Sequence, residues 1–377
     1  MTKELYIGLM SGTSMDGIDA ALVEISTDSC TILHTHSDPW QEDILRQLQR
    51  IIAEPEQATL GKNANLHYEL GRVFARTALR LLDAAGVQPE AITAIGSHGQ
   101  TILHAPDEPS PYSIQLGDPG TIAITTGIPV VADFRNADMA LGGQGAPLVP
   151  AFHRWVFGSR EEDRAVINIG GIANITIMQA DGQTSGFDTG PGNTLLNNWV
   201  SLHCGQPYDN EGTWAAAGNV NHELLAALAG DEYFSRPPPK STGLEYFNLP
   251  WLQRSLDSLT ELPDPQDVQA TLSELTAQQI AHALRKLPAL QQVAVCGGGT
   301  ANSDLISRLL LLLPNCNIRT TSDWGIDPQW VEAAAFAWLA RQRIHGRASN
   351  LPSVTGATAS ISLGGLYLSS SQNQTRD

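Results

Sequence analysis

Charged residues are scarce in this sequence, and positive charge is scarcer still. Asp, Glu, Lys and Arg make up 16% of the 377 residues, below the usual quarter, and the formal net charge is −17. Because a chain with this balance has no general attraction for nucleic acid or an anionic membrane surface, we expect neither as a partner. An anionic small ligand would need a local cluster of donors or a metal ion.

Cysteine clusters, long apolar runs and a leader-like N-terminus are also missing. The four cysteines are dispersed without C-x-x-C spacing, which argues against a zinc site or a disulfide framework and indicates reduced thiols. No apolar run approaches the ~18 residues of a membrane span, and the start lacks a basic region before a long apolar core. We therefore expect a cytoplasmic protein.

The segment between residues 5 and 25 is the most informative part of what is present. An apolar strand, Leu5–Ile7, runs into Gly, Ser, Thr and Met residues, turns at Met15-Asp16-Gly17, and returns as Ala20–Ile25. This pattern predicts a β-hairpin whose tip is rich in N–H groups, hydroxyls and carboxylates. Such a tip can approach a polyphosphate closely, since glycine leaves the backbone uncovered. A plain hairpin with an Asp-Gly turn is the alternative.

Two further glycine turns follow strands in the second half. Ala165–Ile169 leads into Gly170-Gly171 and a returning strand, Asn174–Met178, which repeats the theme of the first hairpin. Val293–Cys296 leads into Gly297–Gly299 and a Leu-rich helix. Strand-to-helix turns with positive φ need glycine as well, so a structural and a phosphate-binding role can coexist.

The length allows two domains, and the repeated theme near residue 165 suggests where the second begins. We expect one domain over residues 1–145 and another over residues 146–377. Within the first, the pattern predicts helices at Gln41–Ile52 and Asn65–Ala85; the second has one apolar stripe and a stop at Gly86.

Polar residues follow two buried strands of the first half. Ala91–Ile95 leads into Gly96-Ser97-His98-Gly99-Gln100-Thr101, and Pro129–Ala132 leads into Asp133-Phe134-Arg135-Asn136-Ala137-Asp138. In open α/β sheets, ligands bind just past the strand ends. These side chains are therefore candidates for a binding site.

Five segments together resemble one family. They are Gly8–Asp19, Gly96–Thr101, Ala132–Asp138, Asn168–Asn174 and Phe187–Asn193. The resemblance is to the anhydro-N-acetylmuramic acid kinase family, within the superfamily of sugar kinases, heat-shock chaperone ATPases and actin, and it extends from about Ile7 to Gly365. It implies an α/β, two-domain actin-like ATPase fold, a duplicated ribonuclease H-like unit, with an interdomain cleft and a hinge.

The same resemblance implies a reaction. Members hydrolyse the 1,6-anhydro bridge of anhydro-N-acetylmuramic acid and phosphorylate its O6 from ATP with Mg²⁺. The products are N-acetylmuramic acid 6-phosphate and ADP, in the recycling of bacterial cell-wall peptidoglycan. Two alternatives remain: a conventional N-acetylhexosamine kinase without ring hydrolysis, and a non-catalytic ATP-driven binding module.

The resemblance also implies the residues that bind ATP. They are Gly12, Thr13, Ser14, Met15, Asp16, Gly17, Ile18 and Asp19 in the first hairpin, Gly170, Gly171 and Asn174 in the second turn, and Gly297, Gly298 and Gly299 beside the adenosine. Many superfamily members carry an Asp early in the first strand, where this chain has Gly8. Its carboxylates come later: Asp16 makes the turn, and Asp19, the candidate metal ligand, faces either magnesium or sugar.

Asp188 is the candidate catalytic base. Opening the anhydro bridge with water needs a carboxylate near C1 to take the proton, while O6 becomes the nucleophile toward the γ-phosphate. Asp188 is followed by Thr-Gly-Pro-Gly, which predicts a turn at a strand end. An Asp that only caps this turn is the alternative.

Four polar residues and one arginine are the candidates for binding the sugar. Arg135 offers a planar fork for the lactyl carboxylate, unless it pairs with Asp133 or Asp138. The others are Ser97, His98, Asp133 and Glu332. His98 either hydrogen-bonds sugar or serves the structure. Glu332 is either a first-turn helix acid or a group that positions substrate or a magnesium-bound water.

A homodimer is the one macromolecular partner that the sequence suggests. Four tryptophans are candidate interface anchors, namely Trp155, Trp199, Trp214 and Trp251.

Overall fold

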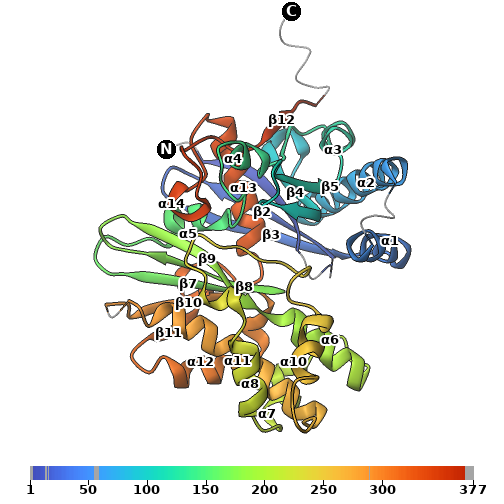
Figure 1. Cartoon of the computed structure of the whole chain (residues 1–377). Coiled ribbons are helices and arrows are strands. Elements are labelled where there is room, and N and C mark those ends of the chain that lie inside the picture. The colour runs from blue at the N-terminus through green and yellow to red at the C-terminus, as the bar shows by residue number, and fades with distance from the viewer. Residues whose placement is uncertain (1–2, 13–14, 16, 55–58, 288, 370–377) are drawn as a thin grey trace, which may run out of the picture. The chain divides into compact units, whose positions relative to one another are not determined.

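The computed structural model describes residues 3–12, 15, 17–54, 59–287 and 289–369. The chain divides into two compact units (Figure 1). Unit 1 comprises Met1–Val156 and Trp330–Asp377, and unit 2 comprises Phe157–Gln329. Among the described residues, no helix combines the length and apolar character of a membrane span.

Unit 1 is built on a 7-stranded sheet with the order β12-β6-β4-β1-β2-β3, to which β5 adds by pairing with β4. Neighbours β1, β2 and β3 are antiparallel, whereas β4 is parallel to both β1 and β6. The strands are β1 (Glu4–Ser11), β2 (Gly17–Ile25), β3 (Cys30–Pro39), β4 (Ile92–Ala105), β5 (Tyr112–Leu116), β6 (Val130–Ala132) and β12 (Gly365–Tyr367). The helices are α1 (Glu42–Ala53), α2 (Leu60–Ala85), η2 (Pro89–Ala91), α3 (Pro119–Thr126), α4 (Asn136–Ala140), α5 (Val149–Phe157), α13 (Val331–Ile344) and α14 (Pro352–Thr355).

Unit 2 is built on a 5-stranded sheet with the order β11-β10-β7-β8-β9. Here β7, β8 and β9 are antiparallel neighbours, and β10 is parallel to both β7 and β11. The strands are β7 (Arg164–Ile169), β8 (Ile172–Met178), β9 (Thr184–Pro191), β10 (Gln292–Cys296) and β11 (Asn317–Thr320). The helices are α6 (Asn193–Cys204), η3 (Asn210–Gly212), α7 (Thr213–Ala216), α8 (His222–Ala229), α9 (Glu232–Ser235), α10 (Leu249–Leu256), α11 (Pro265–Leu284), η4 (Gly298–Ala301), α12 (Ser303–Leu312) and η5 (Thr321–Trp324).

The two sheets repeat one topology. The paths β3-β2-β1-β4-β6 and β9-β8-β7-β10-β11 match in chain order, with an antiparallel meander followed by two parallel strands. Each unit therefore opens with the hairpin that the sequence predicted. The predicted α/β fold class, a duplicated ribonuclease H-like unit of the actin-like ATPases, is confirmed.

Glycines in mid-strand let helix α13 lie directly on the sheet of unit 1 (Figure 1). Gly8 and Gly96 are register partners on β1 and β4. A Cβ on Gly8 would lie 1.7 Å from the Ala333 carbonyl oxygen, and one on Gly96 would lie 2.0 Å from that of Phe336. Both positions therefore need glycine, because any side chain would push the helix off the sheet.

Because of α13, the domain boundaries differ from the predicted ones. We expected residues 146–377 to form the second domain, whereas unit 1 extends to Val156 and includes the segment from Trp330 onward. The segment returns to unit 1 because α13 is apolar nearly all around, and its apolar side chains must be buried against a sheet. Glu332, at its start, is consequently a residue of unit 1.

The apolar stripe predicted for α2 is confirmed. Its members Leu66, Leu70, Phe74 and Leu81 are buried in the core of unit 1, and Gly86 ends the helix with a positive φ of 65°. The helix starts earlier than expected, at Leu60, where Thr59 caps it by accepting from the Lys62 N–H.

Two of the four tryptophans proposed as interface anchors are core residues. Trp199 and Trp251 are buried in one cluster of unit 2, where their indole N–H groups donate to the Pro265 carbonyl and the Asp231 carboxylate, each at 2.8 Å. That part of the expectation is wrong, because large aromatic rings with a satisfied N–H suit a core as well as an interface.

Candidate active site

Side chains inside the sheet of unit 1 hold the tip of the first hairpin. The Ser11 hydroxyl lies 2.7 Å from both the Gly17 carbonyl and Gln100 Oε1. The Gln100 side-chain amide donates to the Gly12 carbonyl at 3.3 Å, and this side chain is fully buried. Gln100 and Ser11 therefore tie both ends of the loop to β4.

The other described residues of this hairpin differ in what they can offer a ligand. Met15 has a positive φ of 55°, and its N–H donates to the Gly12 carbonyl at 3.2 Å. The Ile18 side chain is in the core, so only its backbone can face a ligand. Asp19 accepts from the Ser37 hydroxyl on β3. Thr13, Ser14 and Asp16 lie outside the described residues.

His98 and Arg135 come together in unit 1. Arg135 Nη2 lies 2.8 Å from His98 Nε2, and Arg135 Nη1 donates to the Gly145 carbonyl at 2.7 Å. A guanidinium only donates, so Nε2 of His98 accepts and its proton sits on Nδ1, which donates to the Gly99 carbonyl at 2.9 Å. Burial, with the Arg135 charge, lowers the pKa of His98 to about 3. The ring is a neutral support for Arg135, and both of its nitrogens already have hydrogen-bond partners.

The carboxylate of Asp138 holds the loop whose Gly145 carbonyl accepts a hydrogen bond from Arg135. This fully buried group accepts from the Gly145 N–H at 2.9 Å, Asn350 Nδ2 at 2.8 Å and Thr355 Oγ1 at 2.7 Å. Asp138 and Arg135 are thus linked through Gly145. No local pattern pointed to Asn350 and Thr355.

The three remaining sugar candidates lie around the same strands or at the start of α13. Ser97 is buried on β4, and its hydroxyl has no hydrogen-bond partner among the described residues. Asp133 has a positive φ of 59° after β6 and accepts from Asn136 at 2.7 Å; partial burial raises the pKa of its carboxyl group. Glu332 is half-buried in the first turn of α13.

Two motifs expected just past strand ends lie inside strands instead. Strand β4 continues through Gly96–Thr101, because it pairs with β1 up to Gln100 and then with β5. Strand β9 likewise continues through Asp188 to Pro191, because its pairing with β8 extends to Ile172. Long-range strand pairing therefore overrides the local glycine signal.

In unit 2, the two predicted glycine turns meet at the end of β7. A Cβ on Gly297 would lie 2.8 Å from the Ile169 carbonyl oxygen, and one on Gly299 would lie 2.3 Å from the Ile169 side chain. Asn193 closes the arrangement from the other side, since its N–H donates to the Gly170 carbonyl at 2.8 Å and its amide to the Ile169 carbonyl at 3.1 Å. The sequence argument did not single out Asn193.

A row of polar residues crosses the same sheet. Asn168 on β7 is the register partner of Asn174 on β8, and Asn174 is the partner of Asp188 on β9. Register partners share one face of a sheet, so the three side chains line up. A one-residue register shift adjoins Asp188. Such bulges re-aim side chains and are common beside active sites.

Asp188 is held by a segment that is distant in sequence. The Thr242 N–H donates to Asp188 Oδ2 at 3.0 Å, the Asp188 N–H donates to the Lys240 carbonyl at 3.2 Å, and the Tyr233 hydroxyl donates to the Asp188 carbonyl at 2.8 Å. The residue is 8% exposed. Its position is therefore set by several hydrogen bonds, as a catalytic carboxylate requires.

No role was predicted from the sequence for this supporting segment. Residues 236–239, which include three prolines, are exposed. The chain then turns inward, so that Lys240 is buried and Thr242 reaches Asp188. The run Lys240-Ser241-Thr242-Gly243, small and polar after prolines, was the available signal.

Comparison with known proteins assigns these two units to a family. The family model described as anhydro-N-acetylmuramic acid kinase matches residues 4–369. The chain is 48% identical over 370 residues to the anhydro-N-acetylmuramic acid kinase of Coxiella burnetii (strain Dugway 5J108-111), covering 97% of this chain and 98% of that protein. The chain belongs to the anhydro-N-acetylmuramic acid kinase family. The predicted membership is confirmed.

A second relative gives the same result. The anhydro-N-acetylmuramic acid kinase of Shewanella loihica (strain ATCC BAA-1088 / PV-4) is 46% identical over 368 residues, covering 97% of this chain and 99% of that one. As a member of the anhydro-N-acetylmuramic acid kinase family, the chain is an ATP-dependent sugar kinase with a small-molecule substrate.

Solved structures are similar at a greater distance. The activator of the 2-hydroxyisocaproyl-CoA dehydratase from Clostridium difficile with bound ADPNP has a TM-score of 0.46 and 12% identity, covering 88% of this chain and 92% of that one. A ROK hexokinase from Thermus thermophilus has a TM-score of 0.38 and 14% identity, covering 90% and 99%. Likeness at this level carries no information about the site.

Proposed function

We propose that the protein hydrolyses the 1,6-anhydro bridge of anhydro-N-acetylmuramic acid and phosphorylates the released O6 from ATP. The products would be N-acetylmuramic acid 6-phosphate and ADP, in recycling of the bacterial cell wall. Dependence on ATP favours the cytoplasm as the place of action. The observation that carries the proposal is Asp188, a buried carboxylate at the end of a polar row, held by the Thr242 N–H in a chain of this family.

Asp188 is the proposed general base. It takes a proton from the water that attacks C1, the C1–O6 bond breaks, and O6 attacks the γ-phosphate. A base for this step must be fixed in place, and the hydrogen bond from the Thr242 N–H fixes Oδ2 of Asp188. The alternative role, a cap for the following turn, does not account for a carboxylate bonded to a residue 54 positions away.

The glycine turns are the proposed ATP contacts. In unit 2, Gly297 and Gly299 lie against Ile169 at the end of β7, next to the Gly170-Gly171 turn, and glycine leaves the backbone of such turns uncovered. In unit 1, the corresponding element is the hairpin tip that Gln100 holds through Gly12.

Arg135 is the proposed partner of the lactyl carboxylate. Its guanidinium is oriented by His98 and Gly145, so the rigid fork is pre-positioned for an anionic group. Ser97, Asp133 and Glu332 are proposed to contact the sugar from the same unit.

Mg²⁺ is the proposed metal, bound together with ATP. Among the described residues, no group of three or more His, Cys, Asp or Glu could hold a metal ion. In nucleotide sites Mg²⁺ is usually held by one or two carboxylates, phosphate oxygens and water. Asp19 would supply such a carboxylate, and the ion would neutralise charge on the β- and γ-phosphates.

The reaction can be tested with labelled water. The protein is incubated with ATP, Mg²⁺ and anhydro-N-acetylmuramic acid in ¹⁸O-water, and the product is analysed by mass spectrometry. We expect one ¹⁸O at C1 and phosphate on O6. A phosphorylated open hexosamine without label, formed only from an open sugar, would instead show a conventional kinase.

The role of Asp188 is tested by Asp188→Asn. We expect a folded variant that binds ATP and loses nearly all turnover, by about 10³-fold or more, since the general base is removed. Asp181→Asn, an exposed carboxylate in the β8–β9 turn, is the matched control and should keep full activity. Substantial residual activity in Asp188→Asn would refute the assignment.

The role of Arg135 is tested by Arg135→Lys. Because lysine keeps the charge but loses the fork, we expect the KM for the anhydro sugar to rise about tenfold while the KM for ATP stays within about twofold. Equal changes in both constants would contradict a role in sugar binding.

A further inference from the structure

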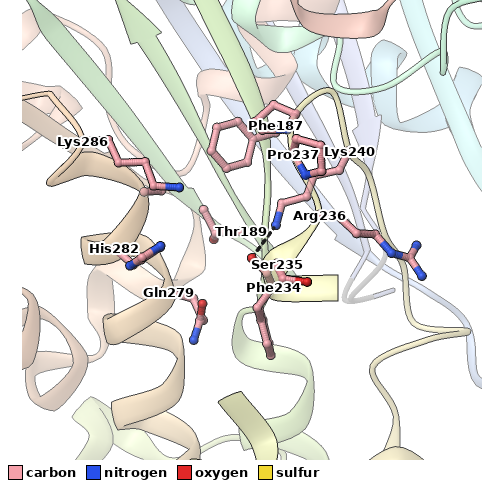
Figure 2. Close-up of a pocket in the computed structure, with 12 residues that line it drawn as sticks. Phe187, Thr189, Phe234, Ser235, Arg236, Pro237, Lys240, Gln279, His282 and Lys286 are labelled. Carbon is pink, nitrogen blue, oxygen red and sulfur yellow. Dashed lines mark hydrogen bonds between the residues drawn. The ribbon is translucent and has the colours of Figure 1, made fainter. Parts of the chain in front are cut away.

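A cavity in unit 2 lies between β9 and helix α11. It has a volume of about 280 Å³, which is near the lower end of small-molecule sites. Figure 2 shows its lining: Phe187 and Thr189 come from β9, Phe234 and Lys240 from the segment that supports Asp188, and His282 and Lys286 from α11 and the turn after it.

The cavity is lined by positive groups and by aromatic rings. Figure 2 shows the ammonium groups of Lys240 and Lys286 directed toward the space beside Thr189, with His282 on the adjacent helix. No Asp or Glu occurs among the described residues that line it. Phe187 and Phe234 supply flat apolar walls. This is the local cluster of donors that an anion would need in a chain with a net charge of −17.

Lys240 is held in place before any ligand arrives. It is 9% exposed, its Nζ donates to the Tyr233 carbonyl at 3.0 Å, and it lies 4.5 Å from the Tyr233 ring centroid. Burial, followed by the charges of Lys286 and Arg236, lowers the pKa of this ammonium group. Two like charges near one cavity repel each other, and a bound anion would relieve that repulsion.

Lys286 is available to a ligand. It makes no hydrogen bond or ion pair with any described residue, and it is exposed. Arg236 is a weaker candidate, because it pairs with Glu232 and Figure 2 shows its guanidinium directed away from Lys286.

The cavity is distinct from the polar row of Asn168, Asn174 and Asp188. Successive side chains of a strand point to opposite faces, so Phe187 lies on the face opposite Asp188. Phe187 packs with Ile175 in the core cluster that α11 covers. Asp188 itself does not line the cavity.

We propose that this cavity is a second anion site, which binds a small phosphomonoester with its phosphate between Lys240 and Lys286 and its organic part against Phe187 and Phe234. Ammonium groups are point charges that suit a tetrahedral phosphate, whereas a carboxylate is matched best by the fork of arginine. The site goes beyond the proposed function and does not rest on it, because nothing in the argument uses the anhydro sugar.

The test is isothermal titration of the full chain, saturated with Mg²⁺ and a non-hydrolysable ATP analogue so that the nucleotide site is filled. The probes are inorganic phosphate, phenyl phosphate and benzoate. We expect phenyl phosphate to bind more tightly than inorganic phosphate, and benzoate to bind at least tenfold more weakly than phenyl phosphate.

Variants of one exposed residue locate the binding. Lys286→Gln should weaken phenyl phosphate about tenfold, and Lys286→Glu should abolish binding, since one charge-assisted contact is lost or reversed. Arg285→Gln is the matched control: it removes a charge from the neighbouring position, whose guanidinium donates to the Leu312 carbonyl, and should change nothing. The proposal is overturned if neither phosphate probe binds, if benzoate binds as well as phenyl phosphate, or if the Lys286 variants bind like the control.

Discussion

In unit 1, glycine stands in the middle of strands, where Gly8 and Gly96 admit the backbone of α13. In unit 2, which has the same strand order, glycine stands at strand ends, where Gly170, Gly192 and Gly297 bring three turns together around Ile169. The same residue type therefore serves helix packing in one unit and a turn cluster in the other. The strand order alone does not show which of these two roles a glycine has.

The units also differ in how they hold their polar residues. In unit 1, side chain contacts side chain, as in Ser11 with Gln100 and His98 with Arg135. In unit 2, the Asp188 carboxylate and the glycine turns accept hydrogen bonds from backbone N–H groups. A side-chain network can be altered one partner at a time, whereas a backbone cluster is disturbed by a single added Cβ.

Histidines mark a third difference. In unit 1, His98 and His153 are buried and His104 is half-buried, and burial lowers their pKa values to about 3, about 3 and about 4 respectively. The histidines of unit 2, namely His203, His222 and His282, are exposed. Acid should therefore act first on unit 1.

The largest expected effect is that of Gly8→Ala. The added Cβ would meet a backbone carbonyl at 1.7 Å with no flexible atom to yield, so we expect a loss of more than ~4 kcal/mol in unfolding free energy, or no folded protein. The measurement is urea unfolding followed by circular dichroism. Gly61→Ala is the control: nothing lies within 4 Å of its Cβ in α2, and it should stabilise by up to ~1 kcal/mol. Similar stabilities for the two variants would refute the packing argument.

Gly297→Ala should be the next most severe change. Its φ of +80° and a contact of 2.4 Å with Asn168 Oδ1 predict a loss of about 3 kcal/mol, which combines backbone strain and crowding. Gly86→Ala has a φ of +65° and nothing within 4 Å, so it isolates the strain, about 1 kcal/mol. Equal losses of unfolding free energy in Gly297→Ala and Gly86→Ala, measured in the same urea assay, would mean that crowding in the turn cluster costs nothing beyond backbone strain.

Gln100→Leu tests the side-chain network of unit 1. The variant removes the contacts with Ser11 and Gly12, and we expect a loss of about 2 kcal/mol with a raised KM for ATP. Gln115→Leu removes the half-buried amide of β5, which donates to Thr101 and Ser113, and should leave the KM for ATP unchanged. An unaltered KM for ATP in Gln100→Leu would show that ATP binding does not depend on how Gln100 holds the hairpin.

The effect of His98 on stability is confined to acid. The folded pKa of His98 is depressed, so the unfolded state binds its proton first; the stability this histidine contributes is complete above the unfolded value of 6.5 and is lost as pH falls toward about 3. His98→Gln, which keeps an acceptor for Arg135, should reduce the slope of unfolding free energy between pH 6 and pH 4 by about 1.4 kcal/mol per pH unit. His222→Gln removes an exposed histidine of unit 2 and should leave the slope unchanged. Hydrogen exchange at low pH, read by mass spectrometry, would show whether unit 1 opens first.

Elements with local signals were predictable from the sequence. The hairpin over residues 4–25 and the strand before Gly170 follow from alternating apolar runs around glycine, and the end of α2 follows from Gly86. Asn193 carried no comparable signal, and the polar run around Thr242 did not reveal its partner, because both roles depend on residues at distant positions in the chain.

The sequence by itself determined the hairpin that opens each unit and the presence of the glycine turns, since strand patterns and glycine act within a few residues. Only the tertiary structure decided that α13 returns to unit 1, that β4 and β9 continue through their motifs, and that Tyr233 and Thr242 hold Asp188. The physical reason is the same in each case. Burial of an apolar helix, pairing of strand edges and satisfaction of a buried carboxylate are all settled by contacts between residues far apart in the chain.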